Sequence, residues 1–267
     1  MQKFILKKTI FVLSFLMVCN LFISNPLKAQ DERLDDFTFE SEEMEDPKQP
    51  YFALSIGVTG NLLFTKYDEL NNKFIVPKNM ELFEGPMFTL GFNVFTALSP
   101  FVNNVRLGIS YNSGSKLTEM KTVEESIETN STRNLSMQMT GIHFDYAFVP
   151  FKSFAILPGI GINWGNMKFE EFNKISSPVS WNDIKATENN QINYSFMAVE
   201  PQVNLEYALT GFLMLRAGVS YIASFDNPLS TYAWTINGNN ELKDVPSDIN
   251  PKGLNVKLGI FLGLFNY

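Results

Sequence analysis

The feature that most constrains the fold is a two-residue period of apolar side chains, which recurs from Tyr51 to the end of the chain. Apolar residues at every second position indicate strands that each have one apolar face. No stretch shows a helical period over three turns. The sequence therefore predicts an all-β fold of eight strands, at residues 51–60, 86–96, 102–111, 134–148, 154–166, 191–207, 212–225 and 253–267.

The connections between these runs alternate between short and long. The short ones contain turn-forming residues such as Pro100, Pro150 and Gly211, and the long ones are polar. An even number of strands with short turns at one end and long loops at the other is the layout of bacterial outer-membrane barrels. We therefore predict an eight-stranded antiparallel up-and-down transmembrane β-barrel in the outer membrane, with both termini in the periplasm. The short gaps are 97–101, 149–153 and 208–211, and the long gaps are 61–85, 112–133, 167–190 and 226–252.

Each strand has one face apolar enough to contact lipid and one face that carries charges, glycine and small residues. In the seventh run, Leu215 and Val219 lie opposite Arg216 and Ser220. A soluble eight-stranded barrel of the lipocalin kind has the same period with the faces exchanged, and it is the alternative. Glycines on the polar face, charges of both signs there and aromatic residues near strand ends favour the membrane barrel. The aromatic residues expected in an interfacial girdle are Phe95, Phe101, Phe148, Phe151, Phe154 and Phe212.

The predicted lumen carries most of the candidate functional side chains. The lumen of an eight-stranded barrel is just wide enough for side chains to fill. Unpaired charges there would be costly, so we expect a paired network that replaces an apolar core. A narrow ion or proton path is the alternative. The expected lumen residues are Arg106, His143, Asp145, Glu200, Gln202, Asn204, Glu206, Arg216 and Lys257.

The sixth run has an ambiguous register. Tyr194 and Phe196 share the parity of Glu200, so apolar and charged side chains fall on one face. Either a bulge at Pro201 resets the face, or that end of the strand stands above the membrane.

The last run raises a similar question. Phe261, Phe265 and Tyr267 share the inward parity of Lys257, whereas the outward positions are aliphatic. Either Asn266 breaks the register, or aromatic residues close the periplasmic end of the lumen. We expect the second.

His143 is the only histidine and shares a face with Asp145. A Ser-His-Asp hydrolase, as in lipid-A-modifying barrel enzymes, would need a serine hydroxyl within about 3.2 Å of the His143 ring. The sequence has no G-x-S-x-G element. A single histidine without a clustered carboxylate loop is also a poor metal-ligand set. We predict no enzymatic activity, no cofactor and no metal site.

Two segments precede the strands. Residues 1–29 have a basic start, an apolar run and a small residue at the end, which predicts a secretory signal peptide. Cys19, the only cysteine, would leave with it. Residues 30–50 are strongly acidic and predict a periplasmic tail or linker, ahead of a barrel domain at 51–267. Alternatively, this arm binds a partner or plugs the barrel through Phe37 and Phe39.

The net charge of −7 argues against nucleic acid as a partner. The expected partners are outer-membrane lipids and other envelope or secretion proteins. Trp181, Tyr232 and Trp234 in the long loops could be contact anchors, or they could lie at the lipid headgroups or pack on neighbouring loops.

A family resemblance rests on the leader ending "LKAQ" and on three stretches of the barrel region. These are "YFALSIGVTGNLLF", "GPMFTLGFNVFTALSPFVNNVRLGISYNSGS" and "LSMQMTGIHFDYAFVPFKSFAILPGIGINWG". The chain resembles the outer-membrane β-barrel domain family of Bacteroidetes, which includes PorT-like proteins. The resemblance implies an outer-membrane barrel and, for PorT-like members, a link to protein secretion. It carries over no functional residues.

The sequence thus predicts an integral outer-membrane barrel that acts without catalysis, through its extracellular loops or its acidic tail. The alternatives are a secretion or transport accessory and a lipid-A-modifying enzyme centred on His143.

Overall fold

The structure, a computed structural model, describes residues 51–99, 101–124, 127–175, 190–238 and 240–266. The predicted signal peptide, the acidic tail with Phe37 and Phe39, Trp181 and Tyr267 lie outside the described residues.

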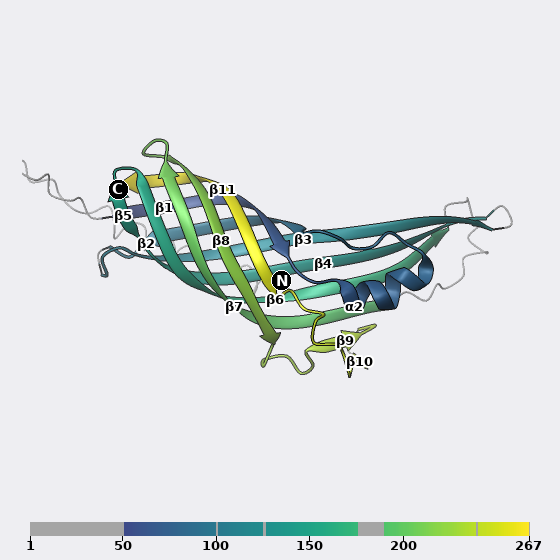
Figure 1. The fold of residues 1–267 in the computed structure, drawn as a ribbon. Coiled ribbons are helices and arrows are strands. Elements are labelled where there is room, and N and C mark those ends of the chain that lie inside the picture. The colour runs from purple at the N-terminus through teal and green to yellow at the C-terminus, as the bar shows by residue number, and fades with distance from the viewer. Residues whose placement is uncertain (1–50, 100, 125–126, 176–189, 239, 267) are drawn as a thin grey trace, which may run out of the picture. The chain divides into compact units, whose positions relative to one another are not determined.

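Eight long antiparallel strands in the described part of the chain form a closed ring (Figure 1). Each pairs with its neighbour along the chain, β6 pairs with β7, and β11 returns to β1. The prediction of an eight-stranded antiparallel up-and-down barrel is confirmed. The eight strands are β1 (Phe52–Phe64), β2 (Met87–Ala97), β3 (Val105–Glu124), β4 (Ile127–Tyr146), β6 (Phe154–Ile175), β7 (Asn190–Ala208), β8 (Leu213–Asp226) and β11 (Gly253–Asn266).

Three short strands are added to this ring. β5 (Phe148–Phe151) pairs with the start of β6 at the short-turn end of the barrel. β9 (Trp234–Ile236) pairs with β7 beyond the last β7–β8 pair, and β10 (Asn240–Glu241) pairs with β9. No helix in the described residues is both long and apolar enough to cross a membrane.

Strands β3, β4, β6 and β7 run past the others at the long-loop end (Figure 1). The β2–β3 ladder ends at Thr89 and Gly114, whereas the β3–β4 ladder continues to Glu124 and Ile127. The ladders of β4 with β6 and of β6 with β7 also continue. Residues 112–124, 127–133 and 167–175 were therefore wrongly predicted as parts of loops. These strand ends are mostly polar, and their apolar alternation is too short to mark a strand.

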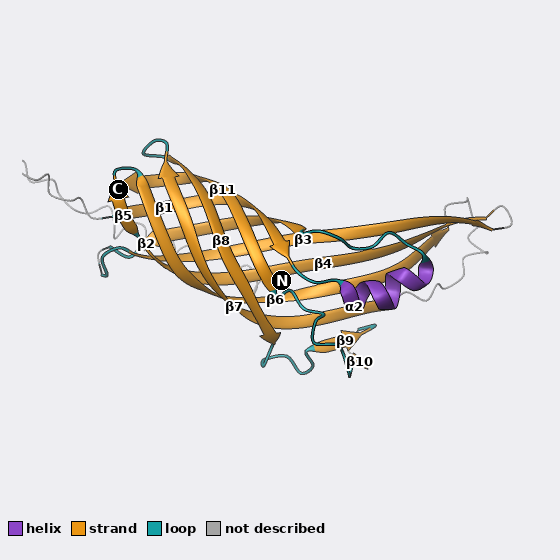
Figure 2. Cartoon of the chain, viewed as in Figure 1, coloured by secondary structure: helices purple, strands orange, loops and turns teal. Residues whose placement is uncertain are grey.

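The segment between β1 and β2, residues 65–86, folds against the inner side of this extension, and we call it the cap segment. It contains α2 (Asp68–Leu70), a π-helical turn η1 (Asn71–Ile75) and a 3₁₀ turn η2 (Val76–Lys78). Figure 2 shows its helical part beside the long strands. The Asn71 amide fastens it, because Nδ2 donates to the Phe83 carbonyl at 3.0 Å and Oδ1 accepts from the Phe83 amide at 2.9 Å.

The two barrel faces differ as predicted. On β11, Leu258 is 65% exposed on the outer face, whereas Phe261 on the inner face is fully buried. The same parity holds on β8, where Leu215 and Val219 are exposed and Ser220 is buried. Apolar side chains therefore cover the outside, and charged side chains lie inside.

Both register questions are settled by the strand ladders. The β6–β7 ladder passes through Pro201 without a shift, so no bulge resets the face there. Tyr194 and Phe196 point inward with Glu200, at the long-loop end of the barrel. In β11, the ladder reaches Asn266 without a break, and Phe261 and Phe265 lie inside at the short-turn end.

Candidate functional site

All nine predicted lumen residues face the interior. Eight of them are buried, and Lys257 is largely covered. Six of the nine are ionisable residues that pair with each other, three cations (Arg106, Arg216, Lys257) and three anions (Asp145, Glu200, Glu206). The formal charge of this set is zero, which is what a narrow, mostly enclosed space requires.

The network begins with two arginines that share one carboxylate. Glu206 Oε1 accepts from Arg106 Nη1 at 2.6 Å and from Arg216 Nε at 2.7 Å. Arg106 also contacts Asp145 Oδ2, at 2.7 Å from Nη2 and 3.1 Å from Nε. Four strands, β3, β4, β7 and β8, therefore meet in one ion-pair chain.

The chain continues toward the long-loop end. Gln202 Nε2 donates to Asp145 Oδ1 at 2.8 Å, and Gln202 Oε1 accepts from Lys257 Nζ at 3.1 Å. Lys257 Nζ lies 2.5 Å from Glu200 Oε1. Glu200 also accepts from Ser220 Oγ at 2.7 Å and from Asn163 Nδ2 at 2.8 Å.

His143 pairs with a serine rather than with a carboxylate. Its Nε2 lies 2.5 Å from Ser110 Oγ, so the distance required for a serine–histidine pair is met. Asp145 instead binds Arg106 and Gln202, and His143 Nδ1 has no hydrogen-bond partner among the described residues. The geometry thus supplies two members of a triad without a group that orients the imidazole.

Glycines make room for these side chains. A Cβ at Gly159 would lie 2.0 Å from Asp145 Oδ1, and one at Gly218 would lie 2.2 Å from Asn204 Oδ1. Asn204 is thus buried directly against the β8 backbone. Larger residues at these two positions would displace the network.

Aromatic rings close the network at the short-turn end. The Arg106 guanidinium carbon lies 4.0 Å from the centre of the Phe95 ring, and that of Arg216 lies 4.0 Å from the centre of the Phe261 ring. The two rings are 5.4 Å apart. The prediction that Phe95 belongs to an outer girdle is wrong, because its position on β2 points inward. Phe101, Phe148, Phe151 and Phe212 are exposed near the short-turn end, and Phe154 is half-buried.

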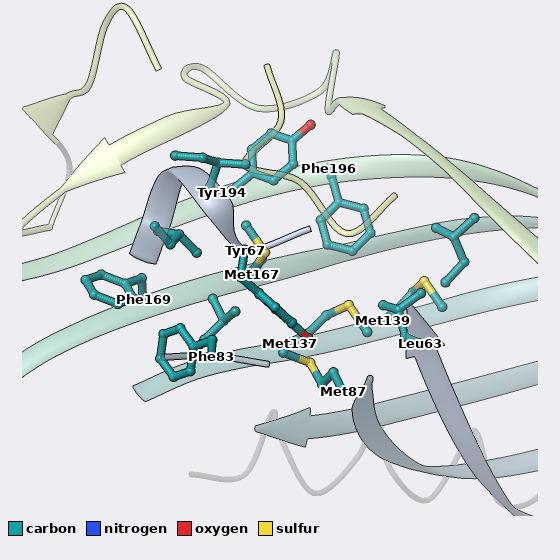
Figure 3. Close-up of a cluster of buried hydrophobic side chains, with 14 of the residues drawn as sticks. Leu63, Tyr67, Phe83, Met87, Met137, Met139, Met167, Phe169, Tyr194 and Phe196 are labelled. Atoms are coloured by element: carbon teal, nitrogen blue, oxygen red, sulfur yellow. The ribbon is translucent and has the colours of Figure 1, made fainter. Parts of the chain in front are cut away.

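An apolar cluster closes the long-loop end (Figure 3). It joins inward residues of the strands with the cap segment, and methionine and aromatic side chains dominate it. Methionine fills irregular gaps because its chain is unbranched and flexible. The labelled members are Leu63, Tyr67, Phe83, Met87, Met137, Met139, Met167, Phe169, Tyr194 and Phe196.

Polar contacts hold the cap segment over this cluster. Lys116 Nζ donates to the Glu84 carbonyl and lies 5.4 Å from the centre of the Tyr67 ring. Burial lowers the pKa of Lys116, and the Glu84 carboxylate partly opposes this. Burial also raises the pKa of Tyr67 to about 12. Tyr67 is therefore neutral at neutral pH.

The space left in the lumen is small. A cavity of about 30 Å³ lies beside Ser110, His143 and Lys257, which is room for about two water molecules. Apolar side chains fill both ends. Within the described residues, no three His, Cys, Asp or Glu side chains are grouped to hold a metal ion.

The two described loop aromatics differ. Trp234 on β9 stacks on Tyr194, with ring centres 4.2 Å apart, so it packs on a neighbouring element. Tyr232 is exposed and stays a candidate contact anchor.

Sequence reasoning missed several partners of the network. Asn163, Ser110 and Ser220 supply neutral hydrogen bonds, and Phe95 supplies a ring contact. Phe261 was predicted to lie inside, but its contact with Arg216 was not. Strand parity could have found Asn163, because it shares the inward face with Gly159 and Gly161. Parity gives the face of a residue, whereas pairing depends on the stagger between strands.

Comparisons with solved structures find proteins of low sequence identity. The attachment invasion locus protein Ail of Yersinia pestis is 9% identical, with 80% of this chain and 99% of that chain covered and a TM-score of 0.38. The N-terminal β-barrel domain of Pseudomonas aeruginosa OprF is 12% identical, with 81% and 100% covered and a TM-score of 0.36. Outer membrane phospholipase A of Escherichia coli is 11% identical, with 83% and 94% covered and a TM-score of 0.21.

No protein-family model matches the sequence, and no curated protein matches it.

Proposed function

We propose that the protein is an integral barrel of the bacterial outer membrane that acts without catalysis, as an interaction component of the cell envelope. One observation carries the membrane assignment. The outer face of the ring is aliphatic and aromatic, whereas three cations and three anions are buried inside. A water-soluble barrel would have the reverse arrangement, because an apolar surface of this extent in water favours aggregation.

A single outer-face substitution separates the membrane barrel from the soluble one. Leu258 is exposed near the middle of β11. Arginine on the lipid face costs about 2–4 kcal/mol at the bilayer midplane, so Leu258→Arg should destabilise the folded barrel in lipid by about that amount. The measurement is urea unfolding in vesicles, with the folded fraction read from the difference in gel mobility between heated and unheated samples.

The matched control is Leu229→Arg, because Leu229 is 88% exposed outside the strands. We expect it to change stability by no more than about 0.5 kcal/mol. A Leu258→Arg protein as stable as the control, or a wild-type protein that stays monomeric in detergent-free buffer, would show that the faces are assigned the wrong way round.

The closed lumen favours a role at the surface over a role as a channel. The polar network lies between apolar clusters at both ends, and the cavity that the described residues leave beside it has a volume of only about 30 Å³. We expect no conductance from purified protein in a planar bilayer. Steady single-channel currents from this protein, absent when an unrelated protein is added to the bilayer instead, would contradict the closed lumen.

The four-strand extension, the cap segment and the connection from β8 to β9, which carries Tyr232, would form the surface available to partners. Strands held by continuous ladders offer a more rigid surface than unstructured loops would. A PorT-like role as a secretion accessory fits this arrangement, since it requires contacts with other proteins rather than a transport path. The test is a photo-crosslinking residue at Tyr232 in native envelopes. Protein adducts are expected there and not from a control residue at Leu258.

The Ser110–His143 pair defines the rival, an enzyme. The pair is buried inside the barrel, away from lipid substrates on the outer face. We therefore expect no labelling of Ser110 by a fluorophosphonate probe, with Ser110→Ala as the control. Labelling of the wild-type protein that Ser110→Ala abolishes would establish a reactive serine and overturn the non-catalytic assignment.

A further inference from the structure

A groove of about 510 Å³ lies at the long-loop rim of the outer face, where β1 ends and β11 begins. Its lower wall is one row of outward side chains across three adjacent strands. Phe64 of β1 pairs with Leu254 of β11, and Leu254 pairs with Tyr221 of β8. All three are exposed.

The upper wall is polar and carries two cations. Lys66 follows β1, and Lys252 precedes β11. Ser247, Asp248 and Asn250 complete the groove lining above the strands. Asp248 is the carboxylate of the lining, with Oδ2 4.0 Å from Lys66 Nζ and both side chains largely exposed. The lysines thus stand directly above an apolar wall.

Hydrogen bonds fix the frame on which the lysines stand. Thr65 Oγ1 donates to the Asn250 carbonyl at 2.9 Å, which ties the first long loop to the last. The Lys252 amide donates to Asn250 Oδ1 at 3.0 Å. At Gly253 the two strands approach so closely that a Cβ would lie 1.9 Å from the Phe64 carbonyl oxygen. The positions of the two lysine backbones are therefore set by the barrel.

We propose that this groove binds a lipid that has an anionic phosphate headgroup, in the outer leaflet. This inference rests on the proposed membrane function. The apolar row would contact the acyl chains, and the ammonium groups of Lys66 and Lys252 would bind the phosphate. Lysine is a common phosphate ligand, and basic residues at a membrane surface attract anionic headgroups. Asp248 opposes the anion and limits its affinity.

The experiment uses full-length protein in nanodiscs of phosphatidylcholine that contain phosphatidic acid, with bound lipid measured by native mass spectrometry. Lys66→Gln and Lys252→Gln should each weaken phosphatidic acid binding about fivefold, which corresponds to about 1 kcal/mol per basic residue. Lys66→Arg and Lys252→Arg should retain binding. Asp248→Asn should strengthen it.

The matched control is Lys152→Gln, because Lys152 is exposed at the short-turn end, beyond the other rim of the barrel. It should leave binding unchanged. Equal losses in Lys152→Gln and Lys66→Gln would overturn the proposal, as would wild-type binding by the Lys66→Gln, Lys252→Gln double variant. Displacement of the lipid by inorganic phosphate alone would assign the site to the free anion, and a dimer broken by the same variants would assign it to a second copy.

The failure of this proposal and that of the membrane assignment are distinguishable. A protein that does not enter nanodiscs contradicts the membrane barrel itself. A protein that enters them, keeps its heat-modifiable mobility in every variant and shows no lysine effect contradicts only the lipid site.

Discussion

The middle of the lumen and its long-loop end are built on the same strands but have opposite chemistry. On β7, the inward residues Glu206, Gln202 and Glu200 belong to the ion network. On the same face, closer to the long-loop end, Phe196 and Tyr194 belong to an apolar cluster. The strand parity does not change between them. The inward face of one strand therefore contributes to two kinds of interior, one ionic and one apolar.

The difference lies in how the two cores tolerate change. Each charge in the middle depends on a particular partner, because a buried ion without one is costly. The long-loop cluster relies on non-directional contacts of methionine and aromatic side chains, which can shift to fill space. We therefore expect a single substitution to cost much of the free energy of unfolding in the ion network, which we call the brittle core, and little in the methionine cluster, which we call the adaptable core.

The largest effect is expected from Glu206→Gln. This change leaves the Arg106 and Arg216 guanidinium groups together without their shared carboxylate. Breaking a buried ion pair on one side costs about 3–5 kcal/mol, and we expect a loss of that order in the free energy of unfolding. Urea unfolding of the refolded barrel in detergent micelles measures it.

The matched control for Glu206→Gln is Glu241→Gln, which removes an exposed pair with Lys243 at 3.4 Å. An exposed pair contributes no more than about 1 kcal/mol, so a small change is expected. If the two variants lose similar stability, the lumen charges are not the brittle core that their contacts indicate.

A smaller and local effect is expected from Asn71→Ala in the cap segment. The substitution removes both hydrogen bonds to the Phe83 backbone, and leaving buried backbone groups unpaired costs about 1–3 kcal/mol. Hydrogen exchange at Phe83 should speed up while the barrel strands keep their protection. Uniform loss of protection over the whole barrel would show that the cap segment and the barrel unfold as one unit.

The smallest effect is expected from Met137→Leu in the apolar cluster. The two side chains have similar volumes, and such exchanges in a core usually cost less than about 1.5 kcal/mol. The same urea measurement used for Glu206→Gln reports it. A loss as large as that of Glu206→Gln would remove the distinction between an adaptable and a brittle core.

The barrel and its faces could be predicted because both depend on local pattern. Side chains alternate between the two sides of any strand, so parity alone placed Arg106, Asp145, Glu206 and Lys257 in the lumen. The same rule placed Phe261 inside. The prediction for Phe95 was wrong because its proximity to a strand end was given more weight than its parity.

The strand extension could not be predicted, because the signal for a strand is apolar alternation. Residues such as Ser115, Glu119 and Thr132 are polar, yet they continue ladders that begin in the barrel. Paired neighbouring strands satisfy their backbone hydrogen bonds, so no apolar face is needed to extend the sheet. The cap segment was missed for a related reason, since its turns are too short for a helical period.

The sequence by itself determined the number of strands in the ring, the alternation of short and long connections, and whether most strand residues face the lumen or the outside of the barrel. These follow from the period of a strand and from turn chemistry. Tertiary structure alone decided which inward groups meet, that Ser110 rather than Asp145 binds the His143 ring, and that an apolar cluster closes the long-loop end of the lumen. Those outcomes depend on the stagger between strands that are distant in the sequence, and ring closure sets that stagger.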